Sequence, residues 1–335
     1  MSVNRLGFVL SLFILAIFSG CGENKKYEGE NFIFGTTIKV VVYGSGNEKY
    51  VKEALEIMRK CDERLNNRAP NGEFKKINDA AGKNGIIISN ESLDLIKRNF
   101  IASNITEGKY DVTMSPLFKL WGFEEQNRTK LPERNEIESA KKFIDYKKVE
   151  IKNNIIKMPA GFSIETGPFL KGYGIALASE ELKKAGVKSA LLTGVSSITA
   201  IGKKPDGKNW KIGLQNPKEP SEILGVLSLD DKSVGVSGDY QTFIEIDGKK
   251  YHHILSLENG MPVDDIKLVV VISDSAEDAD IYDTALFACG KNKIEDVAAK
   301  IKGIEWLYVD SKMEIHMSKG MNKYFTIASG ENNGK

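Results

Sequence analysis

Cysteine and histidine are scarce in this sequence, with three of each among 335 residues. So few cysteines exclude a disulfide-stabilised scaffold, and the lack of any Cys-x-x-Cys pair excludes a zinc ribbon. The three histidines, His252, His253 and His316, are too few for a metal centre built on several histidines. A magnesium-like site would therefore have to use oxygen ligands.

An excess of charge of one sign is also missing, because 47 basic and 46 acidic residues leave a formal net charge of +1. Nucleic-acid-binding proteins usually carry a basic excess, so we expect no nucleic-acid partner. Familiar motifs are absent as well: there is no P-loop, no His-Glu-x-x-His and no Gly-x-Ser-x-Gly. Gly44-Ser45-Gly46 lacks the third glycine of a dinucleotide-binding fingerprint. With 41% hydrophobic residues, the chain still has enough apolar side chains for a sizeable core.

The first residues have the pattern of a secretory signal. Arg5 precedes an apolar run from Leu6 to Phe18, and Ser19-Gly20-Cys21 follows. The run is about 13 residues long, short of the ~20 that a spanning helix needs, although a marginal membrane anchor remains an alternative. The boundary resembles a bacterial lipobox, which implies a signal peptide at 1–20, lipidation (palmitate) on Cys21 and an extracytoplasmic, membrane-anchored lipoprotein. Residues 21–31 are polar and are expected to be a tether.

Hydrophobic periodicity and turn residues predict mixed helices and strands over residues 32–330. Helices are expected at 48–65, 90–108, 133–144, 169–185 and 277–289. Strands are expected at 32–43, 148–158, 189–194, 210–215, 268–272 and 304–309, with a hairpin at 242–255 that turns at Asp247-Gly248. Because there is no strict βαβ repeat and no internal linker, the pattern favours a single compact α+β domain of mixed sheets and packed helices, with room for two lobes. Cys61 and Cys289 are expected to be separate buried thiols.

Two segments could bind a flat ring and an anion. In Lys109-Tyr110-Asp111, the tyrosine could lie against a ring and the aspartate could accept hydrogen bonds from the ring or a sugar. The alternative is an ordinary helix stop followed by an aromatic core cluster. The strand-to-helix turn from Glu165 to Lys171 leaves backbone N–H groups free for an anion, and its lysine adds a positive charge. A plain turn is the alternative here.

Two further segments could supply a base and a cation site. Adjacent strand residues point to opposite faces, so at most one of His252 and His253 enters a given pocket as a general base, unless both are structural. Asp280 and Thr284 lie one helical turn apart and share a face, where a carboxylate and a hydroxyl suit Mg²⁺. Asp283 is expected to point elsewhere. The alternative is an acid in the first helical turn with a packed threonine.

The order and spacing of these segments resemble the ApbE family, the FAD:protein FMN transferases. The resemblance covers about residues 32–310 and rests on these segments: Gly35-Thr36, Tyr110-Asp111-Val112-Thr113, Leu120-Trp121-Gly122, Lys171-Gly172-Tyr173, Ser237-Gly238-Asp239-Tyr240, His253-Ile254-Leu255 and Asp280 with Thr284-Ala285. It implies Mg²⁺-dependent transfer of FMN from FAD to a threonine or serine hydroxyl of a target flavoprotein, with release of AMP.

The resemblance also implies roles for individual residues. Contacts with FAD fall to Phe34, Lys109, Tyr110, Asp111, Glu165 and Lys171. The Mg²⁺ ligands are Asp280, Thr284 and a backbone carbonyl near Pro168, and His253 is the base. The chain departs from the family pattern at 168–170, 195–197 and 256–259. Two alternatives therefore stay open: a Mg²⁺-dependent FAD pyrophosphatase that yields FMN and AMP, and a degenerate, non-catalytic FAD-binding lipoprotein.

Overall fold

The computed structural model describes residues 25–123, 128–219 and 221–328. The expected signal peptide, Cys21 and the start of the tether lie outside these residues. Within the part described, no helix has the length and apolar character needed to cross a bilayer. Cys61 and Cys289 are buried and unpaired, as expected.

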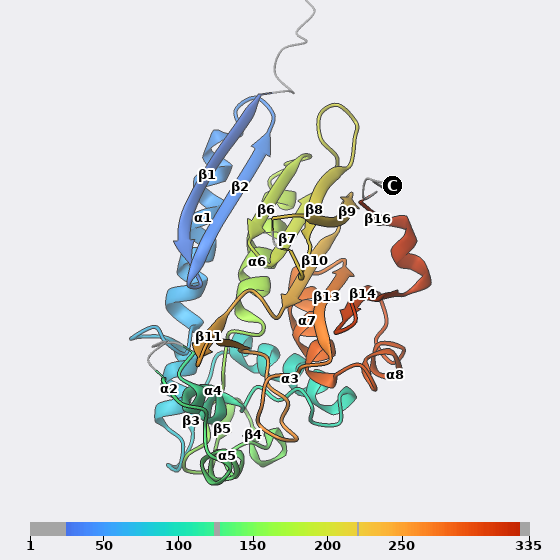
Figure 1. Cartoon of the computed structure of the whole chain (residues 1–335). Coiled ribbons are helices and arrows are strands. Elements are labelled where there is room, and N and C mark those ends of the chain that lie inside the picture. Colours follow the sequence, from blue (N-terminus) through green and yellow to red (C-terminus); the bar gives the residue numbers. More distant parts are fainter. Residues whose placement is uncertain (1–24, 124–127, 220, 329–335) are drawn as a thin grey trace, which may run out of the picture.

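An eight-stranded antiparallel sheet forms the upper part of the molecule in Figure 1, with the order β1-β2-β6-β7-β10-β13-β14-β15. Buried strands such as β13 are almost wholly apolar, because both of their faces are covered. The strands are β1 Lys26–Ile33, β2 Thr36–Tyr43, β6 Ala190–Gly194, β7 Ser197–Ile201, β10 Ser233–Gly238, β13 Ile266–Ser273, β14 Ile304–Asp310 and β15 Ile315–Met317.

Three helices, α1 (Glu48–Leu65), α6 (Leu170–Lys184) and α7 (Ala276–Cys289), pack along one face of this sheet. The apolar stripe of α1 joins the inward residues of β2 in one core cluster. The other face is covered by a small sheet whose apolar side chains share a second cluster with the main sheet. That small sheet consists of β8 Trp210–Gln215, β9 Ile223–Leu229 and β16 Phe325–Ile327.

Shorter helices and hairpins form the lower part of Figure 1, around α3 (Asn90–Ile105), whose first turn is capped by the Ser89 hydroxyl. The other helices are α2 Glu73–Asp79, α4 Ser115–Trp121, α5 Arg134–Lys141 and α8 Ile294–Ala298, with 3₁₀ turns at Tyr146–Lys148 and Lys319–Lys323. The small strands are β3 Ile86–Ile87, β4 Glu150–Lys152 and β5 Ile155–Lys157, and the hairpin is β11 Phe243–Ile246 with β12 Lys249–His252.

The α+β class is confirmed, but two predicted strands are wrong in the same way. The single strand expected at 32–43 is the β1–β2 hairpin, which turns at Phe34 and Gly35 with φ of 55° and 73°. The strand expected at 148–158 is the β4–β5 hairpin, which turns at Asn153 and Asn154 with φ of 48° and 60°. Two consecutive residues with positive φ make the tight turn of a two-residue hairpin. Residues 26–31 of the expected tether consequently belong to β1.

Candidate active site

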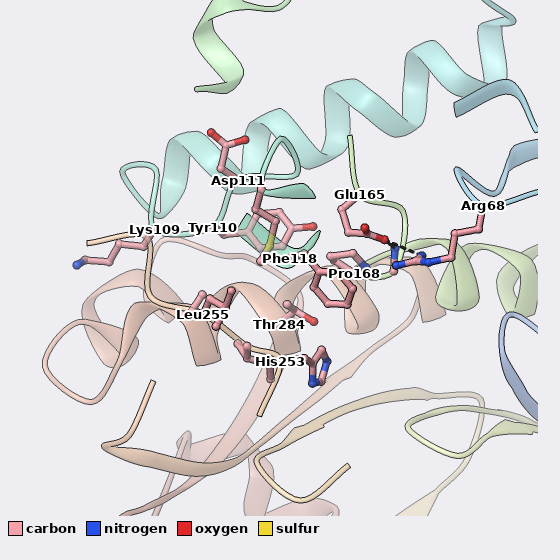
Figure 2. A pocket seen from close by; sticks show the side chains of 14 residues that line it. Arg68, Lys109, Tyr110, Asp111, Phe118, Glu165, Pro168, His253, Leu255 and Thr284 are labelled. Atoms are coloured by element: carbon pink, nitrogen blue, oxygen red, sulfur yellow. Dashed lines mark hydrogen bonds and ion pairs between the residues drawn. The ribbon is translucent and has the colours of Figure 1, made fainter. Parts of the chain in front are cut away.

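Two cavities lie side by side where the lower helices meet the end of α7, and both are lined by Gly167, His253 and Thr284. The first cavity, of about 630 Å³, is walled mainly by apolar groups, among them Met114, Phe118, Pro168, Ile254 and Leu255 (Figure 2). The second, of about 840 Å³, is walled by polar groups, among them Lys171, Ser196, Ser237, Gln241, Asp280 and Asp283. Both volumes are in the range of small-molecule and cofactor sites.

Helix α7 presents three oxygen-bearing side chains to the second cavity: Asp280, Asp283 and Thr284. The expectation that Asp283 points elsewhere is wrong, because residues three apart on a helix are neighbours just as residues four apart are. Its carboxylate accepts hydrogen bonds from the Ser237 hydroxyl at 3.0 Å and from the Thr284 hydroxyl at 2.9 Å. Gly235 makes room for it, since a Cβ at that position would lie 2.6 Å from the Asp283 Oδ2.

The two acidic side chains on α7 are both buried. Asp280 and Asp283 are 4% and 2% exposed. Burial raises the pKa of Asp283 well above its usual range, and the negative charge of Asp280 raises it further, while Lys171 acts in the opposite sense. A cation bound beside these groups would act against this shift, as Lys171 does.

Asp280 is held by three donors from α6 and β7. The backbone N–H of Gly172 donates to Oδ2 at 2.8 Å, and the Lys171 ammonium donates to Oδ1 at 2.8 Å. The hydroxyl of fully buried Ser197 also donates to Oδ1. Ser197 was not identified in the sequence, because its partner lies 83 positions away and no local pattern connects them.

His253 lines both cavities, whereas its neighbour does not. The Nδ1 atom of His253 lies 3.1 Å from the carbonyl oxygen of Thr242, so Nδ1 carries the hydrogen and Nε2 keeps a lone pair. Burial, with a smaller contribution from His252, lowers the pKa of His253 to about 4. His252 is buried, with Nε2 2.7 Å from the Val263 carbonyl oxygen and its ring edge-on to Phe287.

Glu165 and Arg68 form an ion pair at the wall of the first cavity, seen at the right of Figure 2. Glu165 is 2% exposed, and its Oε1 lies 2.8 Å from the Arg68 Nη1. The same oxygen accepts the N–H of Gly167 at 3.1 Å, so the pair fixes the turn that borders both cavities. The Arg68 guanidinium also lies over the Phe118 ring, 5.6 Å from its centroid. Arg68 and Phe118 were missed in the sequence, where neither belongs to a recognised motif.

Two of the residues expected to contact the flavin have side chains that pack on, or accept hydrogen bonds from, other parts of the protein. The Phe34 ring packs on α6 at Gly174, where a Cβ would lie 2.4 Å from it, and Phe34 does not line either cavity. Asp111 lines the first cavity, although its carboxylate points away from His253 and Thr284 in Figure 2. One of its oxygens accepts from the N–H and hydroxyl of Thr113, and the other from the N–H of Tyr146. Asp111 therefore stabilises a local turn, and its Oδ2, which accepts one hydrogen bond, can still accept a second.

The other two residues of this segment border the first cavity. The Tyr110 ring lines it, while the hydroxyl is buried and donates to the Asn99 Oδ1 at 2.6 Å. Lys109 lies at the edge, where its ammonium pairs with Glu258. Lys109 and Glu258 also line a third cavity, on the other side of Lys109. Tyr110 thus supplies a flat wall, and Lys109 a charge at the rim.

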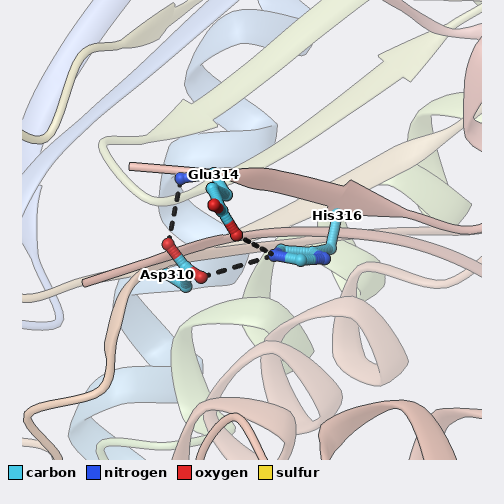
Figure 3. Close-up of side chains that lie close together, drawn as sticks. All are labelled: Asp310, Glu314 and His316. Carbon is cyan, nitrogen blue, oxygen red and sulfur yellow. Dashed lines mark hydrogen bonds and ion pairs between the residues drawn. The ribbon is translucent and has the colours of Figure 1, made fainter. Parts of the chain in front are cut away.

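A second group of acidic residues and a histidine lies at the β14–β15 turn, which follows α7 and α8 in the chain (Figure 3). Ligand atoms of Asp310, Glu314 and His316 lie within 4.8 Å of one another. The fully buried Asp310 accepts the backbone N–H groups of Lys312 and Glu314 at 2.9 Å and pairs with the Lys291 ammonium. These contacts indicate that the group stabilises the β14–β15 turn.

Comparison with known proteins places this architecture in a family. The family model of the ApbE family matches residues 34–308. A Klebsiella pneumoniae protein named FAD:protein FMN transferase is 25% identical over 91% of this chain and 95% of its own length. A Treponema pallidum protein of the same name is 24% identical over 95% of this chain and 94% of its own length.

Solved structures of ApbE proteins have a similar fold. The crystal structure of the ApbE protein from Thermotoga maritima is 27% identical, with a TM-score of 0.83 over 90% of this chain and 99% of that one. The flavin transferase ApbE from Vibrio cholerae shares the fold, with a TM-score of 0.81 at 20% identity over 90% of this chain and 99% of that one. Since the family model covers most of the chain and the architecture agrees, this chain belongs to the ApbE family.

Proposed function

We propose that this protein is an FAD:protein FMN transferase, which moves FMN from FAD to a threonine or serine hydroxyl of an acceptor flavoprotein and releases AMP. The observation that carries the proposal is the pair of adjoining cavities that share His253 and Thr284. The apolar cavity suits a flat ring, and the polar cavity suits a diphosphate with its metal ion. The family membership and the names of the relatives support the same activity.

The residues at the junction fit Mg²⁺. The available donors are the Asp280 and Asp283 carboxylates, the Thr284 hydroxyl and the backbone carbonyls of the turn at Gly167 and Pro168. All are oxygens, which Mg²⁺ prefers, and a bound cation would offset the burial and the Asp280 charge that raise the pKa of Asp283. When bound, Mg²⁺ would neutralise charge on the diphosphate and on the oxygens of the transferred phosphoryl group.

His253 is assigned as the general base. Its Nε2 lone pair can take the proton of the acceptor hydroxyl while the oxygen bonds to the FMN phosphorus and the diphosphate P–O bond breaks, with AMP as the leaving group. With a pKa of about 4 the imidazole is neutral at pH 7, the form that a base requires. A diphosphate in the adjoining cavity brings negative charge, which raises this pKa and strengthens the base.

One assay tests the proposal against its two alternatives. The protein is incubated with FAD, Mg²⁺ and an acceptor domain, while AMP release and the mass of the acceptor are followed. We expect AMP together with an acceptor that gains the mass of FMN. AMP without a labelled acceptor identifies a pyrophosphatase. Bound FAD without AMP identifies a binding protein that has lost its chemistry.

We also propose that the mature protein is a membrane-anchored, extracytoplasmic lipoprotein. The Ser19-Gly20-Cys21 boundary after the apolar run supports this. The variant Cys21→Ala should accumulate as an uncleaved precursor or as a soluble form. A variant that fractionates with membranes and migrates like the wild type would contradict the anchor.

A further inference from the structure

The Lys171 ammonium occupies the carboxylate that the proposed metal site needs. We propose that Lys171 is a placeholder cation: without metal it pairs with Asp280, and when Mg²⁺ binds it leaves Asp280 and moves to the diphosphate in the second cavity. This inference rests on the proposed function, because it assumes that Asp280 and Asp283 take a metal ion. The lysine would thus have two successive partners, first Asp280 and then the diphosphate, instead of contacting the substrate alone.

The hydrogen bonds of Asp280 show which oxygen can change partner. Oδ2 accepts the backbone N–H of Gly172 at 2.8 Å, a contact fixed by the α6 backbone. A Cβ on Gly172 would lie 2.4 Å from the Asp280 Cβ, so the two helices are in close contact at this point. Oδ1 instead accepts from side chains, the Lys171 ammonium at 2.8 Å and the Ser197 hydroxyl. Oδ1 is therefore the atom at which a metal and the ammonium compete.

The charges around the second cavity explain why a placeholder is needed. Asp280 and Asp283 are nearly fully buried, and among the described residues that line this cavity Lys171 alone carries a permanent positive charge. Two buried carboxylates without a cation repel each other. In the pair, the Lys171 and Asp280 side chains are 16% and 5% exposed, so water screens them poorly.

The exchange is sterically simple. Lys171 is the second residue of α6, and a lysine ammonium sits on a flexible four-carbon stem that can rotate while the helix stays in place. It lines the same cavity that the diphosphate would occupy, so the ammonium that Mg²⁺ displaces finds a new anion nearby. Mg²⁺ and FAD should consequently favour each other's binding, and such coupling is reciprocal.

The test is Mg²⁺ binding to Lys171→Met in the absence of flavin, measured by titration calorimetry. Removal of the competing ammonium should tighten Mg²⁺ binding by about tenfold, which corresponds to about 1.4 kcal/mol. Lys183→Met is the matched control, because Lys183 lies on the same helix and its ammonium pairs with Asp231 at the surface, 3.6 Å away. Its Mg²⁺ affinity should equal that of the wild type.

FAD binding gives the second readout. In the wild type, saturating Mg²⁺ should raise FAD affinity, and in Lys171→Met the FAD affinity measured with Mg²⁺ should fall about tenfold because the diphosphate loses the ammonium. If the metal-free Met variant does not fold, Mg²⁺ should restore its folding, because the ion replaces the lost cation. Failure to fold even with Mg²⁺, while Lys171→Arg folds, would contradict the placeholder role.

Other outcomes separate this inference from the proposed function. Equal Mg²⁺ affinity in Lys171→Met and wild type means that the ammonium does not compete, and weaker affinity means that it supports the site. Either result overturns the placeholder role and leaves the proposed metal site intact. If neither protein binds Mg²⁺, the metal part of the proposed function fails and this inference fails with it.

Discussion

Two regions of this molecule look alike in composition, since each brings two acidic side chains close to a histidine. On α7, Asp280 and Asp283 line a cavity that His253 also lines. At the β14–β15 turn, Asp310 and Glu314 lie beside His316. The first region lines a cavity of about 840 Å³, whereas in the second Asp310 is held by the Lys291 ammonium and two backbone N–H groups. The comparison shows why a cluster of acids and a histidine is not by itself a metal site.

The pKa directions of two equally buried carboxyls express the difference. Asp283 and Asp310 are 2% and 0% exposed. The pKa of Asp283 is raised well above its usual range by burial and by its acidic neighbour. Burial also acts to raise the pKa of Asp310, but the Lys291 ammonium and two backbone N–H groups outweigh it and hold that pKa far below the usual range. The Asp283 carboxyl therefore favours its protonated form until a cation binds beside it, whereas the Asp310 carboxylate is already stabilised by donors of the protein itself.

The largest effect is expected from Asp280→Asn. The amide is close to isosteric with the carboxylate but lacks the negative charge that holds a divalent ion, so Mg²⁺-dependent AMP release should fall on the order of 10⁴-fold. The matched control is Asp310→Asn, which should keep full Mg²⁺-dependent turnover in the same assay. Comparable losses in the two variants would break the distinction between the clusters.

The histidines supply the next comparison. His253→Ala should slow FMN transfer by about 10²–10⁴-fold while FAD still binds, because a general base contributes about that much. His316→Ala, in the turn cluster, should leave the transfer rate unchanged, since its ring contacts Asp310, Glu314 and Tyr308 and lines neither of the two cavities. Steady-state rates of acceptor labelling measure both. A larger loss in His252→Ala than in His253→Ala would mean that the wrong histidine has been assigned.

The pH dependence of the rate gives a further check on His253. Its pKa in the free protein is lowered to about 4, so the imidazole is already neutral near pH 6 and should lose its base form only as the pH falls toward that value. Transfer by the wild type should therefore decline in acid, whereas the residual rate of His253→Ala should lack that limb.

A substitution in the group of Asp310, Glu314 and His316 should change the stability of the protein. In Asp310→Asn the amide nitrogen faces either the Lys291 ammonium or the backbone donors, so one buried donor loses its acceptor. The free energy of unfolding should fall by about 2 kcal/mol, measured by urea denaturation. An unchanged denaturation midpoint would show that the turn does not depend on this carboxylate.

Glu277 tests whether burial alone can shift the pKa of an acidic side chain on α7 enough to affect stability. It lies one turn before Asp280, is 5% exposed, lines none of the cavities described above and has an Oε1 without a hydrogen-bond partner. Burial raises its pKa to about 7, with Arg98 acting against the shift. The folded protein thus holds this proton more tightly than the unfolded chain does, and stability should decline as the pH rises from about 4.5 to 7.

The corresponding change is Glu277→Gln, which removes the ionisation. At pH 8 the variant should be more stable than the wild type by about 2 kcal/mol, and at pH 4 the two should be similar. Thermal unfolding at both pH values measures this. A variant that loses stability at pH 8 would show that the ion pair with Arg98, at 3.6 Å, outweighs the cost of burial.

Much of the site could be predicted wherever residues act at helical or strand spacing. Asp280 and Thr284 were proposed because they lie four apart on one helix, strand alternation allowed only one of His252 and His253 into the pocket, and the family resemblance chose His253. Phe34 packs on a glycine of α6 and lines neither cavity, while Asp111 lines the first cavity and also accepts hydrogen bonds from its own turn. A resemblance to a family identifies which positions of the chain correspond to the family's motifs. The direction of each side chain depends on which neighbouring residue leaves space for it or donates a hydrogen bond to it.

The sequence by itself determined the class of the fold, the buried strands and helices, and the local pattern of acids on α7, because hydrophobic periodicity and spacing are properties of neighbouring residues. Only the tertiary structure decided which distant groups meet. Lys171 reaches Asp280 across 109 positions, and Arg68 reaches Glu165 across 97. These pairs decide where charge is satisfied and where it is left for a ligand. They depend on the packing of α6 against α7 and of the α1–α2 loop against the turn at Gly167, which no local pattern specifies.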